Sequence, residues 1–302
     1  MAGIALDETL EQHRRPLHAH CYRLAGNVAD ADDLVQETFL RAWSARDRFE
    51  GRSGVRSWLY RIATNLYLDQ RKAAARRTIP TGDPLEWSAD LGPYPDALLS
   101  EDPESGAVAR ETVELALISA LMHLPPRQRA VFVLAEVSGW TAAEIGQALG
   151  LQRTAVNSLL QRARQTLRTK SPDDAARWRR PELTPEDEDV LRRYAAAVDP
   201  VDFRALLADD VKITMPPDPP VLGVDAAAEF LGRPLDWKVF PSAANGRPAL
   251  INYLRPAGGD QYQACVVDVL RIEHGRIVES NAFVGVRHVL AFGMPATLPS
   301  QL

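Results

Sequence analysis

The chain has 302 residues, of which 46% are hydrophobic and 25% charged, and its formal net charge is −5. This composition is that of a globular protein long enough for two or three domains. The apolar runs are too short to cross a bilayer and the N-terminus carries no secretory signal, so we expect a cytoplasmic protein that does not bind membranes. Cys21 and Cys265 lie far apart in no metal-binding spacing, and we expect buried free thiols, no metal and no cofactor.

The charge is distributed unevenly along the chain. Residues 48–77 hold 8 basic and 2 acidic residues, a net charge of +6, and residues 151–170 hold 5 basic residues and no acid. Residues 78–109 hold 7 acidic residues and neither Lys nor Arg. Local basic blocks, rather than the overall charge, mark contact with nucleic acid. The negative total therefore does not exclude a nucleic-acid-binding protein.

Apolar periodicity predicts three helices in the first part of the chain, over residues 8–25, 31–45 and 55–76. The second contains the acidic stretch DADDLVQETFLRAW. Its polar side chains are expected on one side of the helix: Asp32, Asp33, Gln36 and Glu37. Its apolar side chains are expected on the other: Leu34, Val35, Phe39 and Trp43. Taken alone, this helix either has a solvated acidic face or docks a basic partner.

The third of these helices carries basic and aromatic side chains together, a combination that suits a nucleic-acid single strand. Trp58 falls on the apolar face and is expected in the core. For Asn65, a buried structural amide and a base contact are equally good interpretations. The strongest basic cluster is expected to have no counter-charge: Arg71, Lys72, Arg76 and Arg77.

Residues 109–170 are predicted to be helical again, with the Pro125-Pro126 pair opening a helix. Thr141 and Glu144 form the sequence pattern of a capping box, and Gly150 is a suitable left-handed helix end. Thr154 is expected to cap a second helix running to residue 168. The outer face of that helix is polar and basic: Arg153, Asn157, Ser158, Gln161, Arg162 and Arg164. The pattern predicts a helix-turn-helix, against the alternative of an ordinary helical hairpin.

Residues 184–302 change character. A helix over 185–197 precedes strand-like runs at 211–215, 249–254, 262–273 and 276–284, which predicts an α+β domain. Asp268 shares strand parity with apolar neighbours, so a raised pKa and a catalytic role are one interpretation. We favour the other, in which Asp268 faces solvent or a partner, because no second catalytic group is evident. We therefore expect no catalytic residues and no enzyme.

Three of these stretches resemble, in order, the extracytoplasmic-function group of bacterial RNA polymerase sigma factors. DADDLVQETFLRAW resembles the region 2 helix that binds the clamp helices of the polymerase. RSWLYRIATNLYLDQRK resembles the adjacent region that melts and reads the −10 element. LPPRQRAVFVLAEVSGWTAAEIGQALGLQRTAVNSLLQRARQTLR resembles region 4, which reads the −35 element. The resemblance covers residues 8–170 and implies promoter-specific transcription initiation, with core RNA polymerase and promoter DNA as partners.

The resemblance assigns roles residue by residue. The core-polymerase-binding residues are Asp32, Asp33, Gln36 and Glu37. The −10 DNA-binding residues are Arg56, Asn65, Asp69, Arg71, Lys72, Arg76 and Arg77. The −35 DNA-binding residues are Arg153, Thr154, Asn157, Ser158, Gln161, Arg162 and Arg164.

Residues 184–295 resemble the SnoaL-like branch of the NTF2-like cone fold, and the linker sequence PYPDALL resembles sigma factors that carry such an extension. In those proteins the extension is thought to regulate sigma activity in cis, which reduces the need for an anti-sigma factor. We expect a multidomain fold, with two all-α domains followed by an α+β cone that has room for a small-molecule ligand. The expected boundaries are 1–78 for region 2, 79–109 for an acidic Pro-rich linker, 110–170 for region 4, 171–183 for a second linker and 184–302 for the cone.

Two rival functions remain open from the residues. A helix-turn-helix regulator that acts without polymerase would bind duplex DNA by itself, as a dimer on a palindrome. A cyclase- or isomerase-type enzyme fused to a DNA-binding module would depend on Asp268. The acidic helix followed at once by the aromatic-basic segment favours the sigma factor, because a simple repressor needs neither.

Overall fold

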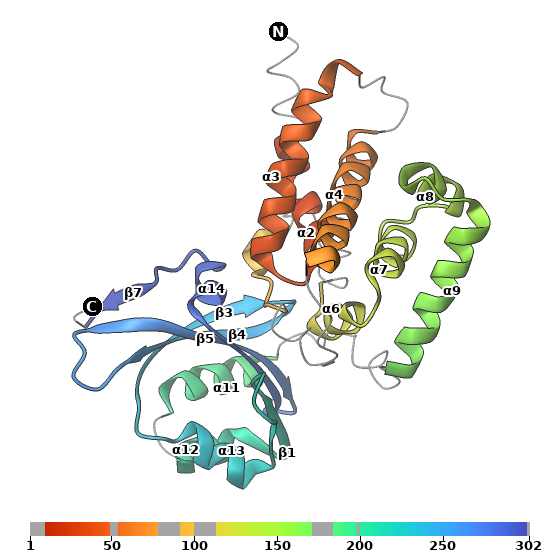
Figure 1. Ribbon diagram of the computed structural model, residues 1–302. Coiled ribbons are helices and arrows are strands. Elements are labelled where there is room, and N and C mark those ends of the chain that lie inside the picture. Colours follow the sequence, from red (N-terminus) through yellow and green to blue (C-terminus); the bar gives the residue numbers. More distant parts are fainter. Residues whose placement is uncertain are drawn as a thin grey trace. The chain divides into compact units, whose positions relative to one another are not determined.

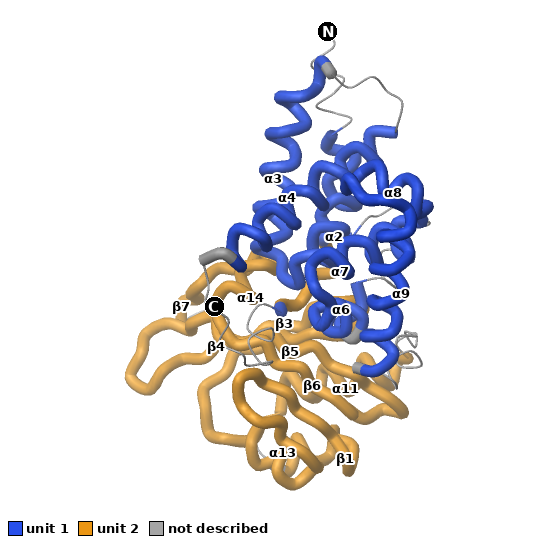
Figure 2. Tube along the Cα trace, turned by 45° about the vertical axis from the view of Figure 1, so that its right-hand side comes forward, with its two compact units in different colours: residues 1–91, 98–179 blue, residues 92–97, 180–302 orange. Residues whose placement is uncertain are grey.

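The computed structural model describes residues 10–48, 54–77, 91–99, 113–170, 184–197 and 200–300. The chain divides into two compact units, shown in different colours in Figure 2. The first unit consists of residues 1–91 and 98–179, and the second of residues 92–97 and 180–302. Helices make up the described part of the first unit, and helices and a sheet make up the second, which confirms the predicted fold class.

The first helical group contains α2 (Arg14–Ala25), α3 (Val28–Ser44) and α4 (Val55–Arg77), followed in Figure 1 from red to orange. Gly26 ends α2 with φ of 89°, and the side chain of Asn27 then caps α3 by accepting a 2.8 Å hydrogen bond from the Asp30 amide. Trp58 is 5% exposed, so its predicted core position is confirmed. The other large buried side chains here include Leu17, Leu24, Leu34 and Leu59. A short 3₁₀ helix, Arg46–Arg48, follows α3.

The second helical group contains α6 (Leu115–Met122), α7 (Pro126–Phe132), a π-helical turn (Val133–Val137), α8 (Ala142–Leu149) and α9 (Arg153–Lys170). The capping box of Thr141 and Glu144 is present, and Gly150 ends α8 with φ of 64°, as predicted. The expected cap at Thr154 is wrong, because α9 already begins at Arg153. An apolar cluster joins α7, α8 and α9 and contains Val131, Leu134, Ile145 and Val156.

Two polar contacts join the two helical groups within the first unit. The buried Arg129 of α7 donates to the carbonyl oxygens of Leu24, Met122 and Leu124, at 2.7, 3.0 and 3.2 Å. The Asn65 side chain of α4 donates to the Ala148 carbonyl oxygen of α8 at 3.1 Å. A buried guanidinium shared among carbonyls and an amide bridging two helices favour one defined arrangement of the groups.

Seven strands within the described residues form one mixed sheet in the second unit, in the order β2-β1-β6-β5-β4-β3, with β7 paired to β5 (Figure 1). Their bounds are β1 (Leu207–Thr214), β2 (Val221–Leu222), β3 (Asp236–Ala244), β4 (Arg247–Arg255), β5 (Gln261–Glu273), β6 (Arg276–Val284) and β7 (Thr297–Pro299). The β1–β6 pair is parallel and every other pair in this sheet, as described, is antiparallel.

Helices cover the sheet from both sides. One face packs against α11 (Pro185–Ala196), α12 (Pro200–Leu206) and α13 (Val224–Leu231), with Tyr194, Leu250 and Leu270 in the shared core. The other face meets α14 (Val286–Leu290) and β7 around Ile251 and Val267. We call the first of these the helix-covered face. Figure 1 shows the two layers on opposite sides of the strands.

The described residues contain no helix that is both long and apolar enough to span a membrane. Both cysteines are free, as expected, but only Cys21 is fully buried, and Cys265 is half-buried. Burial raises the pKa of the Cys21 thiol, which makes this thiol unreactive.

Candidate partner-binding and nucleic-acid-binding surfaces

The polar side of α3 is largely open to solvent. Asp32, Asp33 and Gln36 are exposed and Glu37 is half-buried, so the helix displays these four side chains together. Two of the carboxylates have partners within the unit: Asp32 accepts from His18 Nε2 at 3.1 Å, and Glu37 accepts from Arg41 at 2.9 Å. The opposite side is anchored by the buried Leu34 and Val35.

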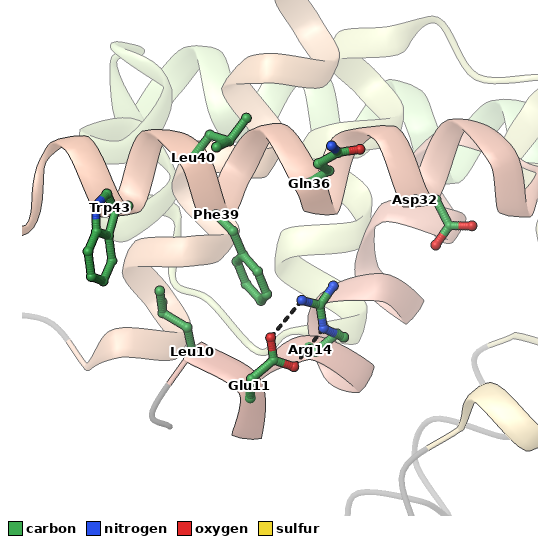
Figure 3. Close-up of a pocket in the computed structure, with 8 residues that line it drawn as sticks. All are labelled: Leu10, Glu11, Arg14, Asp32, Gln36, Phe39, Leu40 and Trp43. Carbon is green, nitrogen blue, oxygen red and sulfur yellow. Dashed lines mark hydrogen bonds and ion pairs between the residues drawn. The ribbon is translucent and has the colours of Figure 1, made fainter. Parts of the chain in front are cut away.

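Two hollows flank this surface. The first, of about 580 Å³, lies between α3 and the start of the chain's described part (Figure 3). Its lining residues are Leu10, Glu11, Arg14, Asp32, Gln36, Phe39, Leu40 and Trp43. The second, of about 530 Å³, lies between α3 and α4. Its lining residues are Asp33, Gln36, Glu37, Leu40, Arg41, Leu66, Asp69, Gln70 and Ala73. The predicted core-binding residues therefore form the ridge between two concave surfaces.

Apolar side chains extend this surface in a way that the sequence analysis missed. Trp43 was expected on the inner side of the helix, but it is 38% exposed, and Leu40 is 57% exposed. Figure 3 shows Trp43 and Phe39 pointing from α3 toward the side of Leu10 and Glu11, whereas Leu40 points away from them. The correction arises because the buried side of α3 continues through the small side chains of Thr38 and Ala42, so Trp43 lies beside this side and not on it.

Some of the basic residues of α4 are exposed, and one is paired with a carboxylate. Arg56 and Lys72 are exposed, as is the acidic Asp69. Arg71 is not without a counter-charge, as was expected, because its guanidinium lies 3.4 Å from the Asp30 carboxylate of α3. Asn65 is half-buried and donates to Arg61 and Ala148 carbonyl oxygens, which supports the structural interpretation of this amide. The side chains of the two remaining candidates, Arg76 and Arg77, lie outside the described residues.

The predicted outer face of α9 is exposed. The exposed side chains are Arg153, Thr154, Asn157, Ser158, Gln161, Arg162 and Arg164. Arg164 is paired with Glu136, with a shortest N–O distance of 2.5 Å, so its charge is partly neutralised within the unit. The inner face is anchored by Val156, Ala163 and Leu167. This arrangement presents one polar, mainly basic helix face, as a recognition helix requires.

A short piece of the acidic linker packs against the sheet domain within the second unit. We call residues 92–97 the strap. Tyr94 of the strap is 0% exposed, and its backbone N–H and C=O pair with the Asn245 side chain and amide, each at 2.8 Å. Asp96 accepts from the Gly246 amide at 2.9 Å, and Pro95 forms a β-bridge with Ala244. The turn between β3 and β4 therefore binds the strap through the N–H and C=O groups of Tyr94 and the carboxylate of Asp96.

The apolar side chains in this acidic, Pro-rich linker, Trp87, Tyr94 and Leu98, predict docking onto a neighbour, and the burial of Tyr94 confirms this for that residue. Leu98 is half-buried, and Trp87 lies outside the described residues. A 3₁₀ helix, Asp96–Leu98, ends the strap. The positive φ values of Asn245 and Gly246, 55° and 71°, shape the turn so that its amides point at the strap.

Asp268 corrects the preferred interpretation of the sequence, because it does not point to solvent. It lies on the helix-covered face with Leu270 and Ile272, and burial raises its pKa to about 7. Its Oδ2 accepts a 2.9 Å hydrogen bond from Asn252, which partly offsets the cost of the charge. No group of three or more His, Cys, Asp or Glu side chains in the described part of the chain could hold a metal ion.

Comparison with known families matches three parts of the chain. Residues 9–77 match Sigma-70 region 2, residues 114–167 match Sigma-70 region 4, and residues 189–280 match the SnoaL-like domain.

Individual relatives match the chain over all or about half of its length. The chain is 38% identical over 316 residues to the ECF RNA polymerase sigma factor SigG of Mycobacterium tuberculosis, covering 95% of this chain and 83% of SigG. It is 35% identical over 163 residues to the ECF RNA polymerase sigma factor SigE of Mycolicibacterium smegmatis, covering 54% of this chain and 60% of SigE. The crystal structure of the Mycobacterium tuberculosis extracytoplasmic function sigma factor SigJ matches with a TM-score of 0.58 and 25% identity, covering 95% and 98% of the two chains.

Proposed function

Because the chain belongs to the extracytoplasmic-function sigma factors of RNA polymerase, we propose that the ridge on α3 binds the core enzyme and that α4 and α9 bind promoter DNA. The observation that carries the first assignment is the combination of exposed acids with exposed Leu40 and Trp43 on one surface. A merely solvated helix face has no reason to expose a tryptophan at the edge of a hollow. A basic partner helix with apolar side chains fits both features.

Charge reversal tests this assignment. We expect Asp33→Arg with Glu37→Arg to lower the affinity for core RNA polymerase more than 10-fold, because attraction to a basic partner becomes repulsion. Affinity is measured by fluorescence anisotropy of labelled full-length chain titrated with purified core enzyme. The matched control is Asp47→Arg, an exposed acid beyond the end of α3. Unchanged core affinity in the double variant, with an unchanged circular dichroism spectrum, would contradict the assignment.

In the described arrangement of the first unit, the two proposed DNA-binding groups lie too close together to contact both promoter elements at once. Asn65 of the proposed −10 surface touches α8, only a few residues before α9 begins. The −10 and −35 elements are about 25 base pairs apart, which is about 85 Å of duplex at roughly 3.4 Å per base pair. A contact of 3.1 Å between the two readers cannot persist when both are on the promoter. We infer that the two helical groups separate before the promoter is bound.

We further propose that the sheet domain restrains this opening by holding the strap. Residues 92–97 lie in the chain between α4 and α6, so the segment that contains them must span the distance between the two helical groups when they separate. The strap is held by paired backbone hydrogen bonds and a completely buried tyrosine, whose burial stabilises the contact by roughly 2 kcal/mol. Regulation in cis then acts through the free length of the linker.

A point variant in the turn between β3 and β4 tests this proposed restraint better than removal of the sheet domain, because removal would also expose Tyr94. Asn245→Gly keeps the positive φ but deletes the oxygen that accepts from the Tyr94 amide. We expect it to raise promoter-specific run-off transcription at least about 2-fold with purified core enzyme. Asn245→Asp keeps an accepting oxygen and is the matched control. Equal or lower transcription from Asn245→Gly, at unchanged core affinity, would contradict restraint by the strap.

A further inference from the structure

The exposed arginines of α9 differ in their partners. Arg164 lies against Glu136 of the π-helical turn, and its Nε and Nη2 donate to the same Oε1 oxygen at 3.2 and 2.5 Å. Arg153, Arg162 and Arg168 are also exposed, and none of these three forms an ion pair with a described residue. One cation of the polar face is therefore neutralised, while the others keep their full charge.

Arg164 shares its side of α9 with side chains near the start of the helix. Arg153, Asn157, Gln161 and Arg164 follow one another at intervals of three or four residues, so they lie on one stripe of the helix surface. With a rise of about 1.5 Å per residue, Arg164 lies roughly 16 Å along the helix from Arg153. Since the major groove is about 12 Å wide, a helix that reads bases with its first turns brings such a distant side chain to the phosphates at the groove edge.

The π-helical turn positions the carboxylate of Glu136. The Ser138 N–H donates to the carbonyl oxygen of Val133, five residues back, at 3.0 Å. Val133 and Leu134 bury one side of this turn, whereas Glu136 is exposed where it meets Arg164. Turns of this type are rare and frequently occur at functional sites. An exposed ion pair contributes little to stability, so the larger effect of this pair is on the charge that α9 presents to DNA.

Glu136 and a DNA phosphate compete for the same donors of Arg164. The Nε and Nη2 atoms form one of the edges through which a guanidinium binds two phosphate oxygens at once. Glu136 occupies this edge, although both side chains remain open to solvent, with 51% of Arg164 and 38% of Glu136 exposed. The negative charge of Glu136 also repels an approaching phosphate. Bidentate binding of a phosphate by this edge therefore requires that Arg164 leave Glu136.

We propose that Glu136 limits the binding of α9 to DNA of arbitrary sequence by holding Arg164, which exchanges Glu136 for a backbone phosphate once α9 lies in the groove. The proposal rests on the DNA-binding role proposed above for α9. Glu136 is a positioning residue, because it acts through Arg164. It increases discrimination between DNA sequences, since the full number of phosphate contacts is reached where base contacts also form.

The test measures binding of the full-length chain to a fluorescein-labelled DNA duplex of random sequence, by fluorescence anisotropy at several salt concentrations. We expect Glu136→Gln to bind about 3- to 10-fold more tightly at about 50 mM salt, and its plot of log affinity against log salt concentration to be steeper by about 0.9, as one additional phosphate contact provides. In an Arg164→Gln background the same substitution should gain less than half as much. Asp189→Asn is the matched control and should change neither quantity, because it removes an exposed acid paired with an exposed arginine, Arg192, in the sheet domain.

Unchanged affinity and salt dependence in Glu136→Gln would overturn the proposal. So would an equal gain in the Arg164→Gln background, because repulsion by the carboxylate alone would then explain it. Arg162→Gln separates this failure from failure of the proposed function, since an α9 that binds DNA must lose affinity when this exposed cation is removed. If Arg162→Gln binds as tightly as the wild-type chain, α9 does not bind the duplex and both proposals fail. Thermal unfolding followed by circular dichroism establishes that each variant is folded.

Discussion

The neighbours of a single residue in the folded protein decide its role, and the sequence alone does not show them. Arg71 and Arg164 are both basic in a basic segment, yet each lies beside a carboxylate, Asp30 and Glu136 respectively. Partial neutralisation weakens their attraction for phosphate, whereas the exposed Lys72 and Arg162 keep their full charge. At His20, burial rather than ion pairing changes the charge of the side chain. Its imidazole is enclosed beside Thr64, and burial first, then nearby arginines, lower its pKa to about 3.

Asp268 provides a pH-dependent prediction. Its pKa in the folded protein, about 7, lies above the ordinary value of 3.8, so the folded state retains a proton that the unfolded state has lost. Stability is therefore lost as pH rises from about 4 to about 7. We expect the stability advantage of Asp268→Asn over the wild-type protein to be larger at pH 8 than at pH 5, by on the order of 2 kcal/mol after allowing for partial solvent exposure.

Thermal unfolding of both proteins at the two pH values measures this effect. Asp260→Asn, which removes an exposed carboxylate, serves as the control. A constant difference between Asp268→Asn and wild type at pH 5 and pH 8 would show that Asp268 is ionised throughout.

The helices and strands are held by local chemistry that their own residues supply. The start of α8 is set by Thr141, whose side chain and amide both bond with the Glu144 carboxylate, at 2.7 Å each. Its end is set by the left-handed Gly150, after which the Leu151 amide donates back to the Gly146 carbonyl oxygen at 2.9 Å. This turn fixes how α9 follows α8, and so fixes the direction of the proposed recognition helix.

Gly146 permits this turn by having no side chain. A Cβ there would lie 2.6 Å from the Leu151 carbonyl oxygen, which belongs to the backbone and cannot move aside cheaply. In an ordinary helix interior Gly→Ala stabilises by about 1 kcal/mol. We expect Gly146→Ala to reverse this sign and destabilise the protein by about 1–3 kcal/mol, measured by urea unfolding followed with circular dichroism.

Gly54→Ala is the matched control for that variant, because a Cβ at Gly54 meets no atom within 4 Å. An equal or higher unfolding midpoint for Gly146→Ala than for Gly54→Ala would mean that the turn between α8 and α9 can adjust without cost.

The whole molecule combines surfaces that cannot all act at once. The proposed core-binding surface of α3 is exposed within the first unit, so we expect core polymerase to bind it without rearrangement of that unit. The contact of Asn65 with Ala148, and that of Arg129 with Leu24, hold the proposed DNA-reading groups together. The strap adds a tie between the connecting linker and the sheet domain. We therefore expect core binding to precede, and promoter binding to require, the separation of the helical groups.

A reversible lock tests this order of events. Asn65→Cys with Ala148→Cys, in a Cys265→Ser background, provides such a lock through a disulfide formed on mild oxidation, because the Asn65 side chain reaches the Ala148 backbone across α4 and α8. Cys21 is buried and does not interfere. We expect the oxidised protein to bind core enzyme normally but to lose promoter-specific transcription more than 10-fold, and dithiothreitol to restore it.

Each single-cysteine variant, oxidised in the same way, controls for the treatment. Undiminished transcription by the fully cross-linked protein would show that the closed arrangement is compatible with promoter recognition.

The amino-acid sequence alone was enough for the domain classes, most element boundaries and the exposed faces of α3 and α9. These follow from periodicity and from capping residues such as Asn27, Thr141 and Gly150, which act over one or two helical turns. Contacts between distant segments were beyond its reach: the ion pair of Arg71, the exposure of Trp43, the burial of Asp268 and the seat of Tyr94 beside Asn245. Each of these depends on which atoms folding brings near a side chain, and burial, charge pairing and a raised pKa arise only from those neighbours.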